Sequence, residues 1–493
     1  MGLDIDRSDF TAQDSEAFAA RLEENLDCLD QMLARPGFGE GPATMGSELE
    51  MYAVDSSGLP LYANEEILAQ AGDPQLTLEL NRYNLEYNLS PYPLAGAAFA
   101  ATEQEILAKL RQVRSVAAGL GGRVVPIGIL PTLRQSDFGP HCITPRRRYM
   151  VLVEQLIQRR GDGFRIDING DDPLKLELSD ITLEGANTSF QVHYRVAPAA
   201  YADTFNAIQL ATPLALAVGA NSPTLFGHRL WCETRVPLFK QSIDTRHMDR
   251  YGWNVPARVN FGQGWARRGA AELFREVVRI YPALMPICAG RSPADEIASG
   301  MTPSLAELRL HQGTVWLWNR PVYDSVEGGH LRIEMRALPA GPTALDMVAN
   351  AAFLIGLAEG LRPHINDLLP GLPFARAEYN FYRAAQHGLE AKLLWPLRGR
   401  SDYRERGVSE IIASVLPLAL AGLEGIGVAP EEARRYIGII DQRLRRRQTG
   451  ATWQRNKLAL LRQAMPLQEA LHALLELYME HSESNLPVAE WPL

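Results

Sequence analysis

The chain has 493 residues, of which 46% are hydrophobic and 22% are charged, and it carries a net charge of −9 with a pI near 5.7. This composition is typical of a globular protein and excludes a disordered or collagen-like chain. The acidic balance argues against a nucleic-acid partner bound through a basic surface. The length allows one large domain with appendages or two to three ordinary domains.

The N-terminal segment is acidic and has no apolar stretch, so no signal peptide is expected. The most apolar stretch, 343–361, contains Asp346 and Glu359 and is expected to be a buried core helix instead of a membrane span. The cysteines form no CxxC motif, which predicts reduced thiols in a cytoplasmic protein. The four cysteines are Cys28, Cys142, Cys232 and Cys288.

The first predicted element is an amphipathic helix over 14–34 with Asp14 as its cap, followed by a break rich in glycine and proline. Strands and helices follow without strict alternation, which favours an α+β fold with a largely antiparallel sheet. Alternating polar and apolar residues predict strands at 46–54, 76–81, 84–89, 164–168, 188–196 and 331–337. Helical spacing predicts helices at 101–120, 145–160, 199–219, 269–281, 343–361 and 376–391.

Several short motifs are assigned to local structure. "GLGG" at 119–122 precedes a short apolar strand instead of following one, so it is not a dinucleotide fingerprint. "DINGDD" at 167–172 lacks the spacing of a calcium loop and predicts a hairpin turn through Asn169 and Gly170. From about 405 the pattern is helical to the end, and its basic run is expected to be a solvated helix face.

Four predicted strands share a two-faced pattern, because successive side chains of a strand point to opposite faces. One face of each strand is apolar and the other is polar. The polar faces hold Glu48, Glu50 and Tyr52; Asn84, Glu86 and Asn88; Gln191, His193 and Arg195; and Arg332, Glu334 and Arg336.

A sheet with one face in water would explain any one of these strands. The residue types argue against that explanation, because the four strands contain no lysine and their polar faces hold acids, a histidine and arginines. Carboxylates with one imidazole suit Mg²⁺ or Mn²⁺, and arginine suits phosphate oxygens. The combination indicates phosphoryl transfer.

An ordered set of segments resembles the glutamate–cysteine ligase family of carboxylate–amine ligases over roughly 45 to 455: "GSELE", "ELNRYNLEYN", "RRRYM", "TSFQVHYRV", "ANSP", "LRIEMRALP", "FYRAAQHGLEA" and, more loosely, "TGATWQR". The resemblance implies a glutamine-synthetase-like fold. Such a fold has a curved, mainly antiparallel sheet with the active site on its concave face and helices behind. The implied domains are an N-terminal helix and linker at 1–40, a catalytic domain at 41–400 and a C-terminal helical region at 401–493.

The resemblance also implies a reaction. ATP would phosphorylate the γ-carboxylate of glutamate or a related acid, and an amine would displace phosphate from the acyl phosphate to form an amide. ATP and Mg²⁺, or Mn²⁺, would be the cofactors, and amino acids the small-molecule partners. The matching metal ligands are Glu48, Glu50, Glu79, Glu86, His193 and Glu334.

The resemblance also implies roles for residues other than the metal ligands. Arg336 corresponds to an arginine that contacts the transferring phosphoryl group, and with Glu50 it is the expected catalytic pair. Gln191 stands where many members have a second histidine, beside the nucleotide or amine pocket. Arg246 is expected to bind the carboxylate substrate. Further substrate-side or phosphate-side candidates, with structural ion pairs as the alternative, are Arg148, Tyr149 and Arg383.

An acyl phosphate would hydrolyse in open water, so the loops at 133–145 and 240–268 are expected to act as lids; 253–265 is either part of a lid or an ordinary surface loop. Two alternatives to the leading hypothesis stay open. One is a ligase of the same fold with a different acid or amine. The other is a non-catalytic relative that binds a nucleotide or amino acid. A homo-oligomer is compatible with either.

Overall fold

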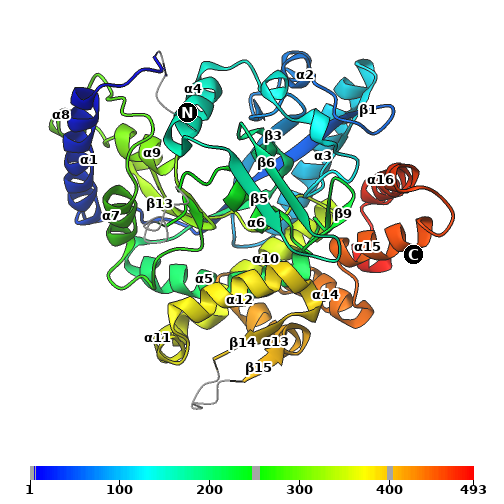
Figure 1. Ribbon diagram of the computed structural model, residues 1–493. Helices are drawn as coiled ribbons and strands as arrows, with labels where there is room; N and C mark the ends of the chain where they lie inside the picture. The colour runs from blue at the N-terminus through cyan, green and yellow to red at the C-terminus, as the bar shows by residue number, and fades with distance from the viewer. Residues whose placement is uncertain (1–4, 6, 247–255, 397–403) are drawn as a thin grey trace.

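The computed structural model describes residues 5, 7–246, 256–396 and 404–493 (Figure 1). Its strands are β1 (Thr44–Asp55), β2 (Leu76–Leu78), β3 (Asn84–Pro93), β4 (Gly122–Val125), β5 (Phe164–Ile168), β6 (Leu174–Leu178), β7 (Phe190–Arg195), β8 (Thr224–Leu225), β9 (His228–Arg229), β10 (Val259–Asn260), β11 (Trp316–Leu317), β12 (Asn319–Asp324), β13 (His330–Met335), β14 (Lys392–Leu394) and β15 (Glu405–Gly407). Its α-helices are α1 (Ala12–Leu33), α2 (Asn64–Ala71), α3 (Ala98–Gly119), α4 (Arg147–Arg160), α5 (Tyr201–Gly219), α6 (Arg235–Ser242), α7 (Ala270–Ile280), α8 (Pro293–Ala298), α9 (Ala306–Gln312), α10 (Ala344–Leu361), α11 (Ile365–Leu368), α12 (Phe374–His387), α13 (Val408–Gly425), α14 (Pro430–Arg446), α15 (Gly450–Leu461) and α16 (Leu467–Ser484).

One antiparallel sheet organises the fold, with strand order β12-β13-β7-β1-β3-β2 and β4 paired to the end of β1. The predicted α+β class with a mainly antiparallel sheet is confirmed. The four strands with polar faces are consecutive neighbours in this sheet, β13-β7-β1-β3, although they come from distant parts of the sequence. The predicted turn after residue 168 is also confirmed, because β5 and β6 pair as a separate antiparallel hairpin.

The apolar face of the sheet packs against helices. Leu49 of β1, Val192 of β7 and Ile333 of β13 are fully buried and belong to the same core as α3, α5 and α10. Burying apolar surface contributes about 25 cal/mol per Å². This packing fixes which face of each strand points inward and therefore places the acids on the opposite face.

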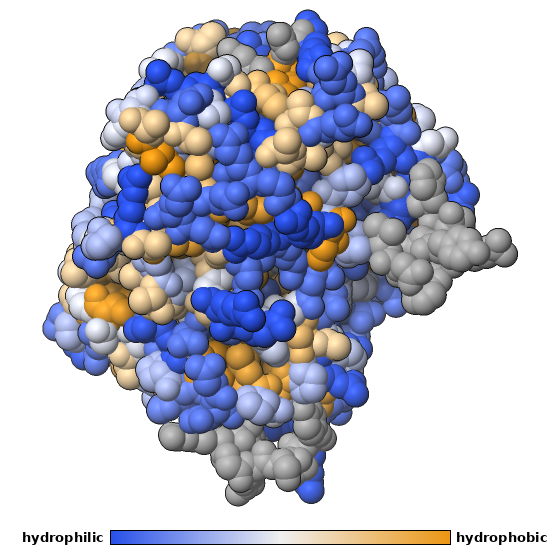
Figure 2. All heavy atoms as spheres, turned by 90° about the vertical axis from the view of Figure 1, so that its left-hand side faces the viewer, coloured by the Kyte–Doolittle hydropathy of each residue, from blue (hydrophilic) through white to orange (hydrophobic). Residues whose placement is uncertain are grey.

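Two helical segments, Ala344–Gly371 and Val408–Gly425, are long and apolar enough to cross a membrane by length and composition alone. The most apolar window of the first is 94% buried within the fold, as predicted for a core helix. On the side of the molecule shown in Figure 2, hydrophobic side chains form small separate patches among hydrophilic ones.

The C-terminal helices are built into the same structure. Gly422 of α13 lies so close to α10 that a Cβ there would come within 2.0 Å of the Gly356 carbonyl oxygen. The basic run was expected to be a solvated face, and this is wrong for Arg443, whose buried guanidinium pairs with Asp346 at 2.8 Å. The domain boundaries at 40 and 400 stay predictions, and residue 400 lies outside the described residues.

Four predicted boundaries need correction. Thr11 caps α1, and Asp14 is the third helical residue of a capping box. The strand predicted over 76–81 ends at Leu78, because the Leu80 carbonyl accepts a hydrogen bond from Thr144 instead of extending the ladder. Helix α12 ends at His387, where Gly388 has a positive φ. Residues 405–407 form strand β15 before the helical region begins.

The first expected lid, 133–145, is packed into the protein. Leu133, Phe138 and Cys142 are buried and belong to a second core that also contains residues of α15 and α16. The other expected lid, 240–268, includes residues 247–255, which lie outside the described residues. A gating role for either segment stays a prediction.

Candidate active site

The register of the sheet brings the predicted acids together. Glu50 on β1 lies opposite Glu86 on β3, and Glu48 lies opposite Gln191 on β7. His193 lies opposite Glu334 on β13. Because these residues share the polar face of adjacent strands, their side chains converge across strands separated by up to about 290 residues of sequence, as the numbering shows.

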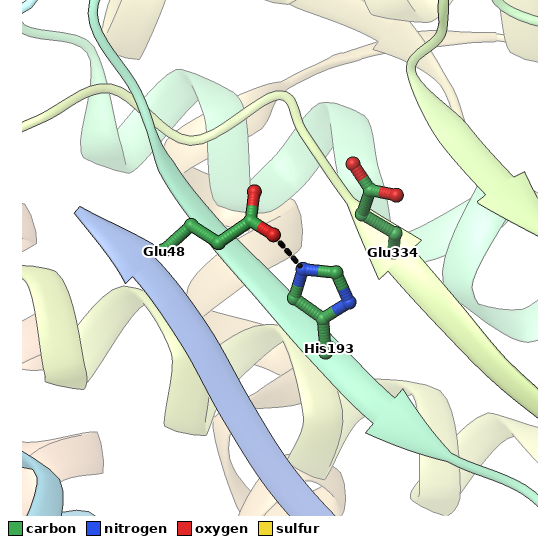
Figure 3. A group of neighbouring side chains, drawn as sticks. All are labelled: Glu48, His193 and Glu334. Atoms are coloured by element: carbon green, nitrogen blue, oxygen red, sulfur yellow. Dashed lines mark ion pairs between the residues drawn. The ribbon is translucent and has the colours of Figure 1, made fainter. Parts of the chain in front are cut away.

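Three of these side chains form a group able to hold a cation. One ligand atom from each of Glu48, His193 and Glu334 lies within 4.8 Å of the others. Figure 3 shows the imidazole between the two carboxylates, on three neighbouring strands. His193 Nε2 is 3.0 Å from Glu48 Oε1, but neither ring nitrogen has a partner with hydrogen-bond geometry among the described residues. An imidazole left in this state suits a metal ligand.

Two arginines hold Glu334. Arg320 on β12 contacts Glu334 Oε2 through Nε at 2.8 Å and through a terminal nitrogen at 2.7 Å. Arg336, one residue beyond β13, contacts Glu334 Oε1. The Glu334 side chain has no exposed surface, whereas Arg336 keeps 15% of its side chain exposed. Arg336 is therefore anchored by a buried carboxylate while a small part of its side chain stays exposed.

Glu50 and Glu86 are positioned by neutral donors. Glu50 accepts hydrogen bonds from the Ser189 backbone N–H at 2.7 Å and from Gln191 Nε2 at 2.8 Å. Glu86 accepts one from Asn88 Nδ2 at 2.9 Å. Gln191 thus orients Glu50, and its predicted place beside a nucleotide or amine pocket stays a prediction.

The electrostatics separate the acids into two groups. Burial, followed by repulsion from neighbouring glutamates, raises the pKa of Glu79 to about 8 and the pKa of Glu86 well above its usual value. Burial also disfavours ionised Glu48 and Glu334. At these two residues the interactions with neighbours outweigh burial: the His193 side chain lowers the pKa of Glu48, and the Arg320 guanidinium lowers that of Glu334. The first group holds carboxylates that lack a counter-charge, which is the condition for binding cations.

Glu79 and Tyr149 lie at the edge of this cluster. Glu79 follows β2, and burial, together with the charges of Glu50 and Glu48, raises its pKa. Tyr149 on α4 donates a hydrogen bond to the Leu78 carbonyl at 2.5 Å. Burial and then the Glu79 charge raise the pKa of the Tyr149 phenol.

Three predicted arginines make no ion pair with these acids among the described residues. Arg148 is exposed on α4. Arg246 pairs with Asp244 at 2.7 Å and directly precedes the undescribed residues. Arg383 on α12 contacts His387 Nε2 at 2.6 Å. Their substrate roles stay predictions.

Three residues of the site were not predicted. Arg320 was missed because Pro321 weakens the strand pattern of β12, which is an edge strand where proline is tolerated. Arg235 is buried at the start of α6, pairs with Glu233 at 3.1 Å and donates to the Ala337 carbonyl. Glu184 lies in a 3₁₀ turn, where side chains follow no strand periodicity. Of these three residues, only Arg320 had a signal in the sequence, because it stands between Asn319 and Pro321 in an alternating strand pattern.

The architecture resembles a solved ligase. The glutamate–cysteine ligase of Francisella tularensis, solved in complex with AMP, matches with a TM-score of 0.54 and 12% identity, over 92% of this chain and 91% of that chain. A bifunctional glutathione synthetase of Pasteurella multocida matches with a TM-score of 0.47 and 14% identity, over 94% of this chain and 55% of that chain. A search of curated proteins finds no match.

The antiparallel sheet and the helices packed on it have the same fold as the Francisella tularensis ligase, and the polar face of the sheet carries acids, an imidazole and arginines. The model of glutamate–cysteine ligase family 2 (GCS2) matches residues 44–477. The chain belongs to this family, which confirms the resemblance found in the sequence and the assignment as an enzyme.

Proposed function

We propose that the protein is an ATP-dependent carboxylate–amine ligase that forms a γ-glutamyl amide through an acyl phosphate. The observation that carries this proposal is the convergence of Glu48, His193 and Glu334 beside Arg336 in a member of this family. The AMP bound to the Francisella tularensis ligase supports a nucleotide site in the same fold.

The donor set fits hard divalent cations such as Mg²⁺ or Mn²⁺, since it is rich in carboxylate oxygen and contains one imidazole nitrogen. Bound metal would neutralise the charge of the nucleotide phosphates during transfer. The fit is supported by His193, whose Nε2 already lies 3.0 Å from a Glu48 oxygen, and by the raised pKa values of the nearby acids. The residues that would hold metal are Glu48, Glu50, Glu79, Glu86, His193 and Glu334.

The protein's own groups would position the reactants. Arg336, fixed by Glu334, would bind oxygens of the phosphoryl group as it moves from ATP to the carboxylate substrate, releasing ADP. The amine nitrogen would then attack the acyl carbon, and the bond from carbon to the phosphate oxygen would break. Gln191 would keep Glu50 oriented during these steps. Arg246, Arg148, Tyr149 and Arg383 are proposed to bind substrates, and the unpaired cysteines favour a reducing cytoplasmic setting.

The test is ADP release across pairs of amino acids and amines, with products identified by mass. We expect ADP that requires both an acid and an amine, and a product whose mass is the sum of the two minus water. A folded protein that binds ATP yet turns over no pair in the panel would instead favour the non-catalytic alternative. That alternative is disfavoured because every expected acid, the histidine and Arg336 are present.

Divalent metal is expected to raise the melting temperature more at pH 8 than at pH 6. The folded-state pKa of Glu79 is raised to about 8, above that of an unfolded carboxyl. A raised carboxyl pKa gives stability at low pH that is lost as the pH rises toward 8, so the metal-free protein should become less stable over this range. A bound divalent cation would supply the positive charge that the acids lose when they release their protons. We expect the gain with Mg²⁺ or Mn²⁺ to be larger by about 2 °C or more at pH 8.

Differential scanning fluorimetry at both pH values measures this gain. NaCl at matched ionic strength is the control for screening. The site would be contradicted if divalent metal raised the melting temperature no more than NaCl does. It would also be contradicted if the rise were the same at the two pH values.

A further inference from the structure

A buried ion pair contacts the backbone that carries Arg336. Arg235, the first residue of α6, donates from one terminal nitrogen to the Ala337 carbonyl at 3.1 Å and from the other to the Arg336 carbonyl at 3.5 Å. The same guanidinium pairs with Glu233 at 3.1 Å, and neither side chain is more than 3% exposed. The backbone N–H of Arg336 donates to the Trp318 carbonyl at 2.9 Å. The ion pair therefore holds Arg336 from its carbonyl side.

Glu233 is the fixed point of this pair. One of its carboxylate oxygens accepts hydrogen bonds from the Ser222 hydroxyl at 2.6 Å and from Arg235 at 3.1 Å. The other oxygen accepts one from the Asn221 backbone N–H at 2.9 Å. All of these residues are buried. Because three donors hold the carboxylate, its orientation is defined, and it in turn sets the direction of the Arg235 guanidinium.

The C-terminal helices hold the side chain of Asn221. Its Nδ2 donates to the Tyr478 hydroxyl of α16 at 2.8 Å, and its Oδ1 accepts a hydrogen bond from Gln454 Nε2 of α15 at 2.8 Å. A Cβ at Gly450, the first residue of α15, would lie 2.0 Å from Asn221 Oδ1, so glycine is required for this close approach. Two segments that resemble the family, "ANSP" and "TGATWQR", therefore meet away from the polar face of the sheet.

A positional role explains why a charged pair is kept in this place. A buried ion pair adds little net stability over apolar side chains of the same size, because both charges are removed from water. What it supplies is direction, since the N–H groups of a guanidinium form a rigid fork. A displacement of about 1 Å in a group that contacts the reacting atoms can cost about 10²-fold in rate.

We infer that Glu233 is a positioning residue for Arg336, and that α15 and α16 support it through Asn221. The inference rests on the proposed function, in which Arg336 binds the transferring phosphoryl group. It gives the C-terminal helices a part in catalysis, although the seven strands of the sheet all come before residue 336.

The first test is Glu233→Gln in the full-length protein, assayed with the acid and amine that react fastest in the ADP-release panel. Glutamine has only one accepting oxygen, so either Arg235 or the Asn221 N–H loses its acceptor. We expect kcat to fall about 10- to 100-fold. The KM values for ATP and for the acid should stay within about threefold, because Arg336 acts mainly on the transition state.

Combining Glu233→Gln with Arg336→Ala separates positioning from general damage. If Glu233 acts through Arg336, the change at Glu233 should lower kcat by no more than about twofold once the Arg336 guanidinium is gone. The same factor in both backgrounds would overturn the inference. It would mean that Glu233 is purely structural or that Arg235 itself contacts a substrate.

Tyr478→Phe tests the far end of the network. It removes the hydroxyl that accepts from Asn221 and leaves no buried charge unpaired. The loss of this neutral hydrogen bond should lower kcat about 3- to 10-fold, and this effect should also disappear in the Arg336→Ala background. Tyr436→Phe is the matched control, because it removes a buried hydroxyl of α14 that donates to Glu103 at 2.7 Å, and it should leave kcat unchanged.

Glu307→Gln is the matched control for Glu233→Gln. The Glu307 side chain is 1% exposed and lies 3.5 Å from an Arg21 nitrogen, so the same substitution removes a charge from another buried pair. We expect its melting temperature to fall and its kcat to stay at the wild-type value. Melting curves of all variants establish that each is folded at the assay temperature, and if Glu233→Gln is not, Tyr478→Phe with and without Arg336→Ala decides the question.

The remaining outcomes distinguish the inference from the proposed function. An unchanged kcat in folded Glu233→Gln or in Tyr478→Phe would overturn the inference and leave the proposed function intact. An equal loss of kcat in Glu307→Gln would show that lost stability is the cause, and would also overturn it. If the wild-type protein releases ADP with no pair of substrates, the proposed function fails, and the positioning role fails with it.

Discussion

Replacing Arg336 by alanine is expected to lower kcat for ADP formation by about 10³-fold or more. An arginine placed on a transferring phosphoryl group stabilises charge that develops in the transition state, and losing such a group typically costs this much. Arg336 fits the role because Glu334 anchors it and part of its side chain stays exposed. Steady-state ADP release with saturating ATP, acid and amine measures the effect.

The same substitution should change the melting temperature by only a few degrees when Mg²⁺ is present. Glu334 keeps its two contacts with Arg320, so no buried carboxylate is left without a counter-charge. Arg332→Ala is the matched control, because Arg332 is on the same strand but pairs with Asp324 at 2.8 Å, away from the acids. Activity retained in Arg336→Ala would show that the phosphoryl group is bound elsewhere.

Replacing Glu50 by glutamine is expected to lower kcat by about 10²- to 10³-fold and to abolish most of the metal-induced stabilisation. Glutamine has nearly the same shape. Its carbonyl oxygen can accept from the Ser189 N–H, and its NH2 group can donate to Gln191 Oε1 once the Gln191 amide turns over. It lacks the charge that a divalent cation requires. Without metal the variant should melt at the same temperature or higher, because burial raises the pKa of Glu50 and makes its charged form costly in the folded state.

Activity assays over a Mg²⁺ titration and melting curves with and without Mg²⁺ test both halves of this expectation. Glu66→Gln removes a charge from the exposed surface of α2 and serves as the control. A Glu50→Gln variant with a wild-type metal response would exclude Glu50 as a ligand. A variant that unfolds in the absence of metal would show instead that the Glu50 charge stabilises the fold.

The sequence predicted the polar strands well because strand periodicity is local. Alternation in "ELEMYAV" placed Glu48 and Glu50 on one face, and the sheet confirms it, with Leu49 and Met51 buried on the other. The same reasoning failed for β12, where Pro321 interrupts an edge strand. It could not predict Glu184, because side chains in a 3₁₀ turn do not follow strand periodicity. Arg320 and Glu184 are therefore residues that only the structure reveals.

Boundaries were less accurate than element types for a related reason. The strand predicted through residue 81 ends at Leu78, because the chain beyond it hydrogen-bonds to the segment at Thr144. The basic C-terminal run was expected to be solvated, yet Arg443 is buried against Asp346, nearly 100 residues earlier in the chain. In both cases a distant segment supplied a partner that local sequence does not contain.

The sequence by itself determined which chemical groups are present and which face of each strand they occupy, because both depend on residue type and on a two-residue period. The tertiary structure decided that β13, β7, β1 and β3 are neighbours, and that His193 therefore lies between Glu48 and Glu334. It also decided which acids are paired with arginine and which lack a counter-charge. Strand order, register and burial are set by packing between segments far apart in the chain, and these in turn set the pKa values and cation affinity of the site.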